Sequence, residues 1–182
     1  TLNTLQSLQI KAEYKLKEDF DKLQRQLQTY KAQFNQLTKE IRSRGSSQYG
    51  LVNKLNNSYL KLDSLFKQVP DSAVLPPDYL LLREFQQKFT LNAENSYKYR
   101  FQEISQKYKQ KIQADTVLAP ALKNRLLVAL EGYSLYFNRL INKENQLGSL
   151  NGKGLQNRME DQILAIESTT QGILRKVKAR NA

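Results

Sequence analysis

Arginine is the side chain in this sequence best suited to binding a small charged molecule. Its guanidinium group presents a planar set of N–H donors that matches a carboxylate with two parallel hydrogen bonds. Arg83, Arg100, Arg139 and Arg158 lie on segments close to predicted chain breaks. Several such side chains converging on a gap between helices would form an anion site, so these four are our candidate ligand-binding residues. The alternative for each is an exposed or ion-paired arginine on a helix surface.

The residue types that perform most catalysis are missing. The chain has 182 residues with no cysteine and no histidine, which excludes disulfides, zinc sites built on these residues, and catalytic triads or dyads that need them. Carboxylates such as Glu103, Glu131 and Glu160 are typical of solvated or paired groups on helices. The sequence GKG at residues 152–154 lacks the spacing of a phosphate-binding loop. We predict that the chain is not an enzyme and holds no cofactor or metal.

The net charge of +12 is typical of proteins that bind nucleic acid or an anionic membrane. Lysine and arginine are nevertheless scattered through every segment, without a basic stripe interleaved with accessible aromatic rings. The densest basic run covers residues 175–180. It fits a nucleic-acid contact, a helix that approaches an anionic membrane, or cations that favour the end of a helix. We predict no nucleic-acid partner.

Composition predicts an all-α fold with long helices. Seven glycines and four prolines leave few places to turn, and Leu, Gln, Lys and Glu outnumber β-branched residues. No apolar run approaches the ~18 residues that span a bilayer. Periodicity and breaks predict six helices, at about residues 4–44, 51–69, 78–90, 94–114 and 120–146, with a last one that carries Met159 to Val177.

The first of these segments carries a heptad seam, in which apolar residues recur at alternating steps of four and three. Such a seam is typical of a helix that packs along its whole length against a partner helix. Its members are Leu16, Phe20, Leu23, Leu27, Tyr30, Phe34, Leu37 and Ile41.

The chain also contains an internal repeat. Leu23, Leu27, Tyr30, Phe34, Asn35 and Leu37 recur at one constant offset as Leu126, Leu130, Tyr133, Phe137, Asn138 and Leu140. Two copies of one design, at about residues 22–69 and 125–180, would each form a long helix, a turn and a returning helix. Chance alignment of leucine seams is the alternative. Because a helical hairpin cannot bury both faces alone, we expect an elongated bundle of two stacked four-helix modules that share long helices.

The middle of the chain resembles a known family. Residues 82–101, LREFQQKFTLNAENSYKYRF, resemble the mid-chain signature of the helical bimodular sensor domain of bacterial chemoreceptors. Phe89 matches the family's Phe, residues 92–95 its turn, and Tyr97 the Tyr that opens its next helix. The sequence departs from the family at residues 86–88, where Gln, Gln and Lys replace Glu, Lys and Asp.

A later segment extends this resemblance to roughly residues 60–167. From Tyr133 a Tyr-x3-Phe helix is followed by a glycine turn, Gly-Leu and a helix that ends near Glu167, as in the family. The resemblance implies one domain over residues 1–182, on the periplasmic side of an inner-membrane receptor and between two membrane helices. It also implies a homodimer through the first and last helices.

The function implied by this resemblance is sensing of a small metabolite. Domains of this family bind small molecules, often organic acids, between helices and pass a small helix displacement inward, in a chemoreceptor or a sensor histidine kinase. The alternative function is a cytoplasmic basic helical scaffold that binds anionic membranes or partner proteins.

Overall fold

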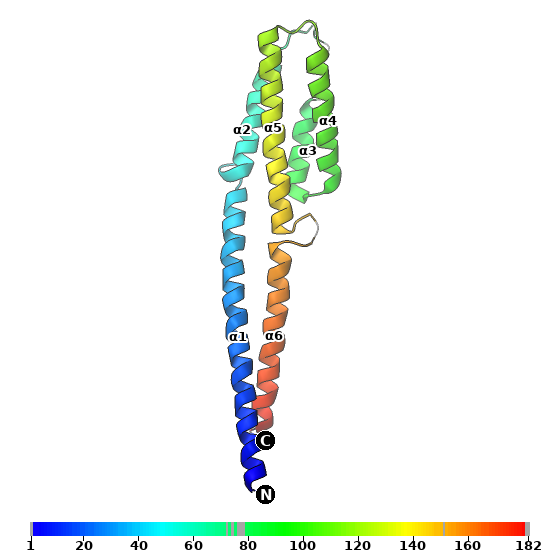
Figure 1. The fold of residues 1–182 in the computed structure, drawn as a ribbon. Coiled ribbons are helices and arrows are strands. Elements are labelled where there is room, and N and C mark those ends of the chain that lie inside the picture. Colours follow the sequence, from blue (N-terminus) through cyan, green and yellow to red (C-terminus); the bar gives the residue numbers. More distant parts are fainter. Residues whose placement is uncertain (1, 72, 74, 76–78, 151, 181–182) are drawn as a thin grey trace. The chain divides into compact units, whose positions relative to one another are not determined.

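A computed structural model of the chain contains six helices, and no strand occurs in the part that it describes (Figure 1). It describes residues 2–71, 73, 75, 79–150 and 152–180, with the backbone alone for residues 2–12, 14 and 180. The all-α prediction is confirmed. The helices are α1 (Leu2–Arg44), α2 (Gly50–Phe66), α3 (Tyr79–Asn92), α4 (Asn95–Ala114), α5 (Pro120–Leu147) and α6 (Leu155–Arg180).

The helix ends lie close to the predicted breaks because glycine and proline mark them. Gly45 follows α1 with φ 72°, and its N–H donates to the carbonyl of Ile41 at 3.0 Å. Pro120 supplies the first turn of α5, where its missing N–H leaves no helical hydrogen bond unmade. Gly148 ends α5 in the left-handed region at φ 102°. Asp78, at the predicted start of the third helix, lies outside the described residues.

The connection between α3 and α4 is a turn at a single left-handed residue. Ala93 has φ 52°, and its N–H donates to the carbonyl of Phe89 at 2.8 Å. On either side of the turn the rings of Phe85 and Tyr97 stack at 6.5 Å between centroids. Phe89 itself is fully buried and meets the ring of Phe137 edge to face at 5.1 Å. The break therefore reverses the chain while apolar contacts hold the two helices together.

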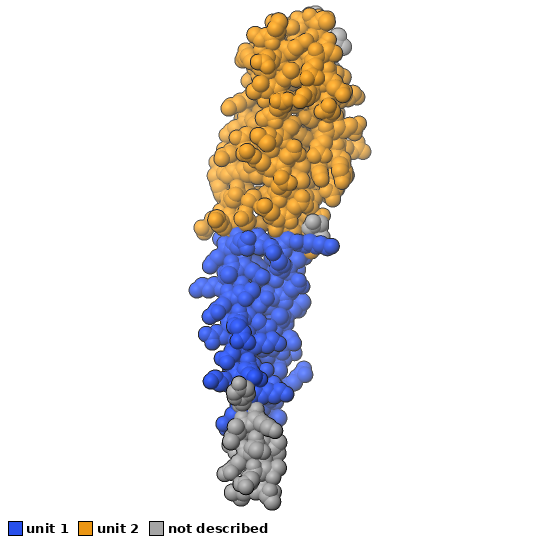
Figure 2. All heavy atoms as spheres, viewed as in Figure 1, with its two compact units in different colours: residues 1–38, 153–182 blue, residues 39–152 orange. Residues whose placement is uncertain are grey.

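The chain divides into two compact units, coloured separately in Figure 2. Unit 1 consists of residues 1–38 and 153–182, and unit 2 of residues 39–152. Each unit takes residues from both predicted repeat copies, so the division does not follow the repeat. The assignment of residues 22–69 and 125–180 as two modules stays a prediction.

Unit 2 has a well-packed aromatic core. Within it α2 packs on α5, α3 on α4, and α4 on α5. Phe101 lies at the centre, with its ring 4.0 Å from that of Phe137 and 5.2 Å from that of Tyr133. Each such ring contributes roughly 1.5–3 kcal/mol through burial. The fully buried large side chains include Phe89, Phe101, Tyr108, Tyr133, Phe137, Leu55, Leu62, Leu82 and Leu126.

The described part of unit 1 consists mainly of two antiparallel helices, α6 and residues 2–38 of α1. Lys176 of α6 forms an ion pair with Asp19 of α1. Further along, Gln26 donates from Nε2 to the carbonyl of Ala165 at 3.4 Å, and Gln162 donates to the carbonyl of Gln26 at 3.1 Å. Since the pair is antiparallel, the beginning of α1 and the end of α6 lie at the same end of unit 1 (Figure 1).

The predicted heptad seam of the first helix is only half covered. Leu16, Leu23 and Tyr30 are half-buried, together with polar residues between them such as Gln26. Leu37 is half-buried as well, and the other four seam positions remain about half exposed: Phe20 at 51%, Leu27 at 49%, Phe34 at 49% and Ile41 at 47%. A single partner helix covers too narrow a face to bury both halves of the seam. Half of the predicted seam therefore stays uncovered within one chain.

Candidate functional site

A basic pocket lies at the turn between α1 and α2 in unit 2. Its volume is about 370 Å³, within the range typical of small-molecule sites. Three helices contribute to it: Ser43 at the end of α1, the first turns of α2, and the last turns of α5. Lys54, Arg139 and Lys143 line it, and its described lining includes no carboxylate.

Two glycines build the turn that shapes this pocket. Gly45 and Gly50 both have positive φ, 72° and 74°. A side chain on Gly45 would place its Cβ 2.1 Å from the carbonyl oxygen of Tyr49 and 2.7 Å from the Cα of Gly50. The turn is therefore closed by backbone contact that only glycine permits at residue 45. It brings the first residues of α2, Gly50 and Leu51, into the pocket wall.

The start of α2 adds to the attraction for an anion. Tyr49 occupies the N-cap position and makes no side-chain capping hydrogen bond. The N–H groups of the first turn of a helix have no partners inside the helix and carry a partial positive charge. Gly50 and Leu51, in this turn, line the pocket together with the three cations. The helix dipole and the cationic side chains therefore both attract an anion.

The three cations are only partly neutralised. Lys143 forms an ion pair with Glu40 at the end of α1. The guanidinium of Arg139 lies over the ring of Tyr136, 5.5 Å from its centroid. Within the described part of the chain, Lys54 and Arg139 have no carboxylate within 4.0 Å. The pocket thus keeps an excess of positive charge, which favours a carboxylate or another small anion.

Next to the pocket residues, a buried ion pair joins α1 to α5. Glu144 is only 3% exposed and pairs with Nε of Arg44. Arg44 also donates from Nη2 to the carbonyl of Thr90 at 2.9 Å, and this hydrogen bond connects α1 to α3. The sequence analysis did not single out Glu144. Its helical spacing could have identified it, because Glu144 lies on the same buried stripe of α5 as Leu140 and Leu147.

Arg83 belongs to a different, neutral polar network. Its Nη1 donates to Oδ1 of Asn56 at 2.7 Å and to Oε1 of Gln86 at 2.5 Å. Its guanidinium lies 4.8 Å from the centroid of the Tyr59 ring. Gln86 is buried, and its Oε1 also accepts a hydrogen bond from the hydroxyl of Tyr133 at 3.3 Å. Burial raises the pKa of Tyr133, so this hydroxyl stays a donor across the physiological range.

The other two candidate arginines have surroundings of their own. Arg100 lines a smaller cavity of about 230 Å³ with Glu103 and Lys107, where a carboxylate is already present. Arg158 lies exposed in α6 of unit 1. Within unit 2, then, the basic pocket combines Arg139 with Lys54 and Lys143 and not with Arg83 or Arg100. The two lysines were missed because nothing in sequence distinguishes them from other helix-surface lysines.

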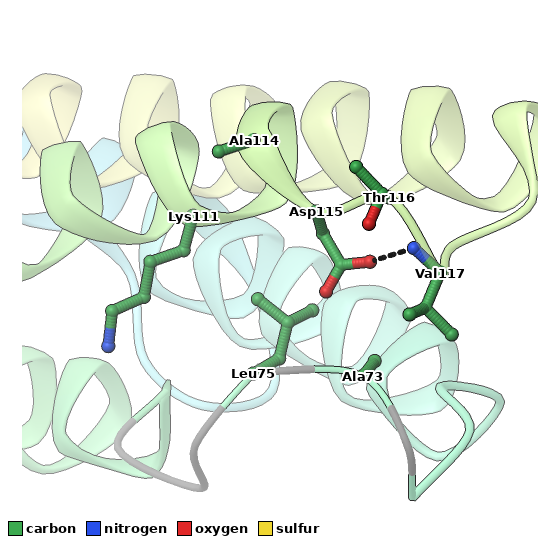
Figure 3. Close-up of a pocket in the computed structure, with 7 residues that line it drawn as sticks. All are labelled: Ala73, Leu75, Lys111, Ala114, Asp115, Thr116 and Val117. Atoms are coloured by element: carbon green, nitrogen blue, oxygen red, sulfur yellow. Dashed lines mark hydrogen bonds between the residues drawn. The ribbon is translucent and has the colours of Figure 1, made fainter.

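A larger cavity of about 550 Å³ lies between the α2–α3 connection and the end of α4 (Figure 3). Asp115 projects into it, and its carboxylate accepts hydrogen bonds from the N–H groups of Val117 at 2.8 Å and Leu118 at 2.9 Å. The carboxylate thereby fixes the turn into α5. Its negative charge opposes an anion, although Lys111 also lines the cavity, so the basic pocket suits an anionic ligand better.

Comparison with known proteins gave no match: no family model, no curated protein and no solved structure is similar to the chain. Among the described residues, no helix is long and apolar enough to cross a membrane. The same residues contain no cluster of acidic side chains that could hold a metal ion.

Proposed function

We propose that the chain is a ligand-binding sensor domain of the helical bimodular type, from a bacterial transmembrane receptor with chemoreceptor or histidine-kinase output. Its ligand is a small anion such as an organic acid, and its place is the periplasmic side of the inner membrane. The observation that carries the proposal is the basic pocket beside the start of α2, where Lys54 and Arg139 have no carboxylate partner among the residues that the structure describes. The chain acts by binding and not by catalysis.

The pocket offers a route from binding to signalling. Its wall joins the last turn of α1, through Ser43, to α2 and α5. An anion that contacts Lys54 and Arg139 favours the arrangement in which these helices lie closest, and so shifts the population of conformers. Because α1 is one helix of 43 residues, a displacement of its last turn is carried along its length. The two ends of the described chain lie at one end of unit 1, which suits a domain inserted between two membrane helices.

A thermal-shift screen with organic acids, nitrate and amino acids tests the site. A dicarboxylate at about 100 times its Kd stabilises the protein by ~2.7 kcal/mol, which raises Tm by roughly 5–10 °C. Arg139→Gln removes a charge-assisted donor and lowers the affinity at least about tenfold. The control Arg158→Gln, in unit 1, leaves the affinity unchanged. If no anion at millimolar concentration raises Tm, the proposed site is wrong.

The repeat supports a homodimer through α1 and α6. Tyr133 and Phe137 of α5 are fully buried in the core of unit 2. Their counterparts in α1 are less covered, since Tyr30 is half-buried and Phe34 is 49% exposed. Phe20, Leu27 and Phe34, spaced seven residues apart, leave an apolar stripe uncovered on α1. Two copies of the α1–α6 pair would provide the four helices that bury it, and would complete the second four-helix module expected from the sequence.

Leu27→Glu tests the dimer. A charge in the middle of the stripe would have to be buried in the interface, so the dimer dissociation constant is expected to rise at least about tenfold. Leu60→Glu is the matched control, because Leu60 is similarly exposed, at 59%, but lies on α2 in unit 2. Sedimentation equilibrium measures both. A wild-type chain that remains monomeric at every accessible concentration would contradict the proposal.

One observation favours a second function, that of a basic scaffold on anionic membranes. Helix α4 carries five basic side chains and a single acidic one. Binding to anionic vesicles that is lost as salt rises, with no response to small anions, would favour this function over sensing.

A further inference from the structure

Another cavity opens along the groove between α2 and α5. It has a volume of about 520 Å³ and is formed entirely by unit 2. On α2 its wall includes Ser58 and Lys61, and on α5 it runs from Asn124 to Tyr136. No sequence motif predicts it, since its residues are spread over two helical surfaces.

This cavity has a cationic part and an apolar part. Lys61 and Arg125 supply the positive charge, and its described lining includes no carboxylate. In the part of the chain that the structure describes, neither cation has a carboxylate within 4.0 Å, and Arg125 donates only a long hydrogen bond to Gln68 at 3.4 Å. Val128 and Ala129 contribute apolar surface. The lining therefore matches a molecule with one charged end and an apolar body.

Gly132 keeps this cavity open. It lies inside α5, where glycine weakens a helix relative to alanine. A Cβ added to it would meet no atom within 4 Å, and its φ is not in the left-handed region. Neither packing nor backbone conformation therefore requires glycine at this position. What the missing side chain provides is space in the cavity wall, one turn before Tyr136.

We propose that this cavity binds a small monocarboxylate with an aromatic or aliphatic body. Arg125 holds the carboxylate with its paired donors, and Lys61 adds charge. The apolar body lies against Val128 and Ala129, over the space left by Gly132. A dicarboxylate fits less well, because its second charge would lose water against apolar side chains. The proposal stands independently of the basic pocket and of the sensor function.

Calorimetric titration with benzoate and hexanoate tests the ligand class. Each is expected to bind saturably at one site, and benzamide and hexanamide, which lack the charge, about tenfold or more weakly. Arg125→Gln is expected to lower benzoate affinity at least about tenfold. Arg158→Gln, exposed in unit 1, is the control and is expected to leave benzoate affinity unchanged. Because the two sites share no lining residue, Arg125→Gln tests this cavity and Lys54→Gln tests the basic pocket, so failure of one site is distinguished from failure of the other.

Substitutions of Gly132 test the position. Gly132→Leu fills the cavity and is expected to abolish benzoate binding. Gly132→Ala is expected to raise Tm by roughly 2–4 °C through helix propensity while weakening binding. Gly172→Ala, in α6, also has open space around its Cβ and is the matched control, with a similar rise in Tm and unchanged binding.

Three results would overturn the proposal. The first is the absence of saturable binding of either acid at about 10 mM. The second is binding that tolerates both Arg125→Gln and Gly132→Leu. The third is equal affinity for benzoate and benzamide. Should Gly132→Leu prevent folding, the exposed Arg125→Gln substitution and the amide comparison decide the matter on their own.

Discussion

Arg44→Met is expected to destabilise the protein by about 3 kcal/mol, because it leaves the carboxylate of Glu144 buried without a cation. Glu144 is 3% exposed and pairs with Arg44, which also donates to the carbonyl of Thr90. Loss of the guanidinium removes both interactions at once. The double variant Arg44→Met, Glu144→Met is expected to recover most of the lost stability, since well-packed apolar side chains replace buried ion pairs at little cost.

Urea unfolding followed by circular dichroism measures this effect. The control is Lys88→Met, which breaks an ion pair with Glu84 whose two side chains are 46% and 47% exposed. A surface pair of this kind contributes less than about 1 kcal/mol. If Arg44→Met costs no more than Lys88→Met, Glu144 is not buried as described. If the double variant is no more stable than the single one, the loss of stability comes from the missing ion pair itself and not from the unpaired buried charge of Glu144.

Gly45→Ala is expected to have the second large effect, a loss of roughly 2–4 kcal/mol. Left-handed backbone costs a residue with a Cβ roughly 1–2 kcal/mol. The new Cβ would also lie 2.1 Å from the carbonyl oxygen of Tyr49, so the backbone of the turn must move. Because Gly45 lies against Gly50, which lines the basic pocket together with Leu51, anion affinity should fall together with stability.

The same measurements on Gly172→Ala provide the comparison, since that position is open and is expected to gain stability. Two different failures can be told apart for Gly45. Unchanged stability would contradict the close approach of Gly45 to Gly50. Reduced stability with unchanged anion affinity would contradict the location of the site at this turn.

The sequence predicts the helices well because their limits are set locally. Pro120 and Gly148 bound α5 through their own backbone preferences, without help from distant residues. The all-α fold follows for the same reason. Arginine was also recognisable as a candidate ligand residue by type alone, and Arg139 lies in the basic pocket.

The neighbours of each side chain could not be predicted from the sequence, because they depend on which helices pack together and in what axial register. Lys54 and Lys143 resemble other surface lysines until α2 and α5 are placed antiparallel. Arg83 looked equally suited to a ligand, yet neutral partners occupy its Nη1. One of them is Gln86, and no carboxylate of the described residues lies within 4.0 Å of the Arg83 guanidinium.

Helices α1 and α6 of unit 1 are held at one height relative to each other. Gln26 both donates to Ala165 and accepts from Gln162, and Asp19 pairs with Lys176. A slide of one helix by a single turn, about 5.4 Å, would separate all of these partners. An apolar seam would tolerate such a slide far better, because apolar contacts are not directional. Unit 1 therefore resists sliding of one helix along the other, and a displacement along the helix axes is expected to move both helices together.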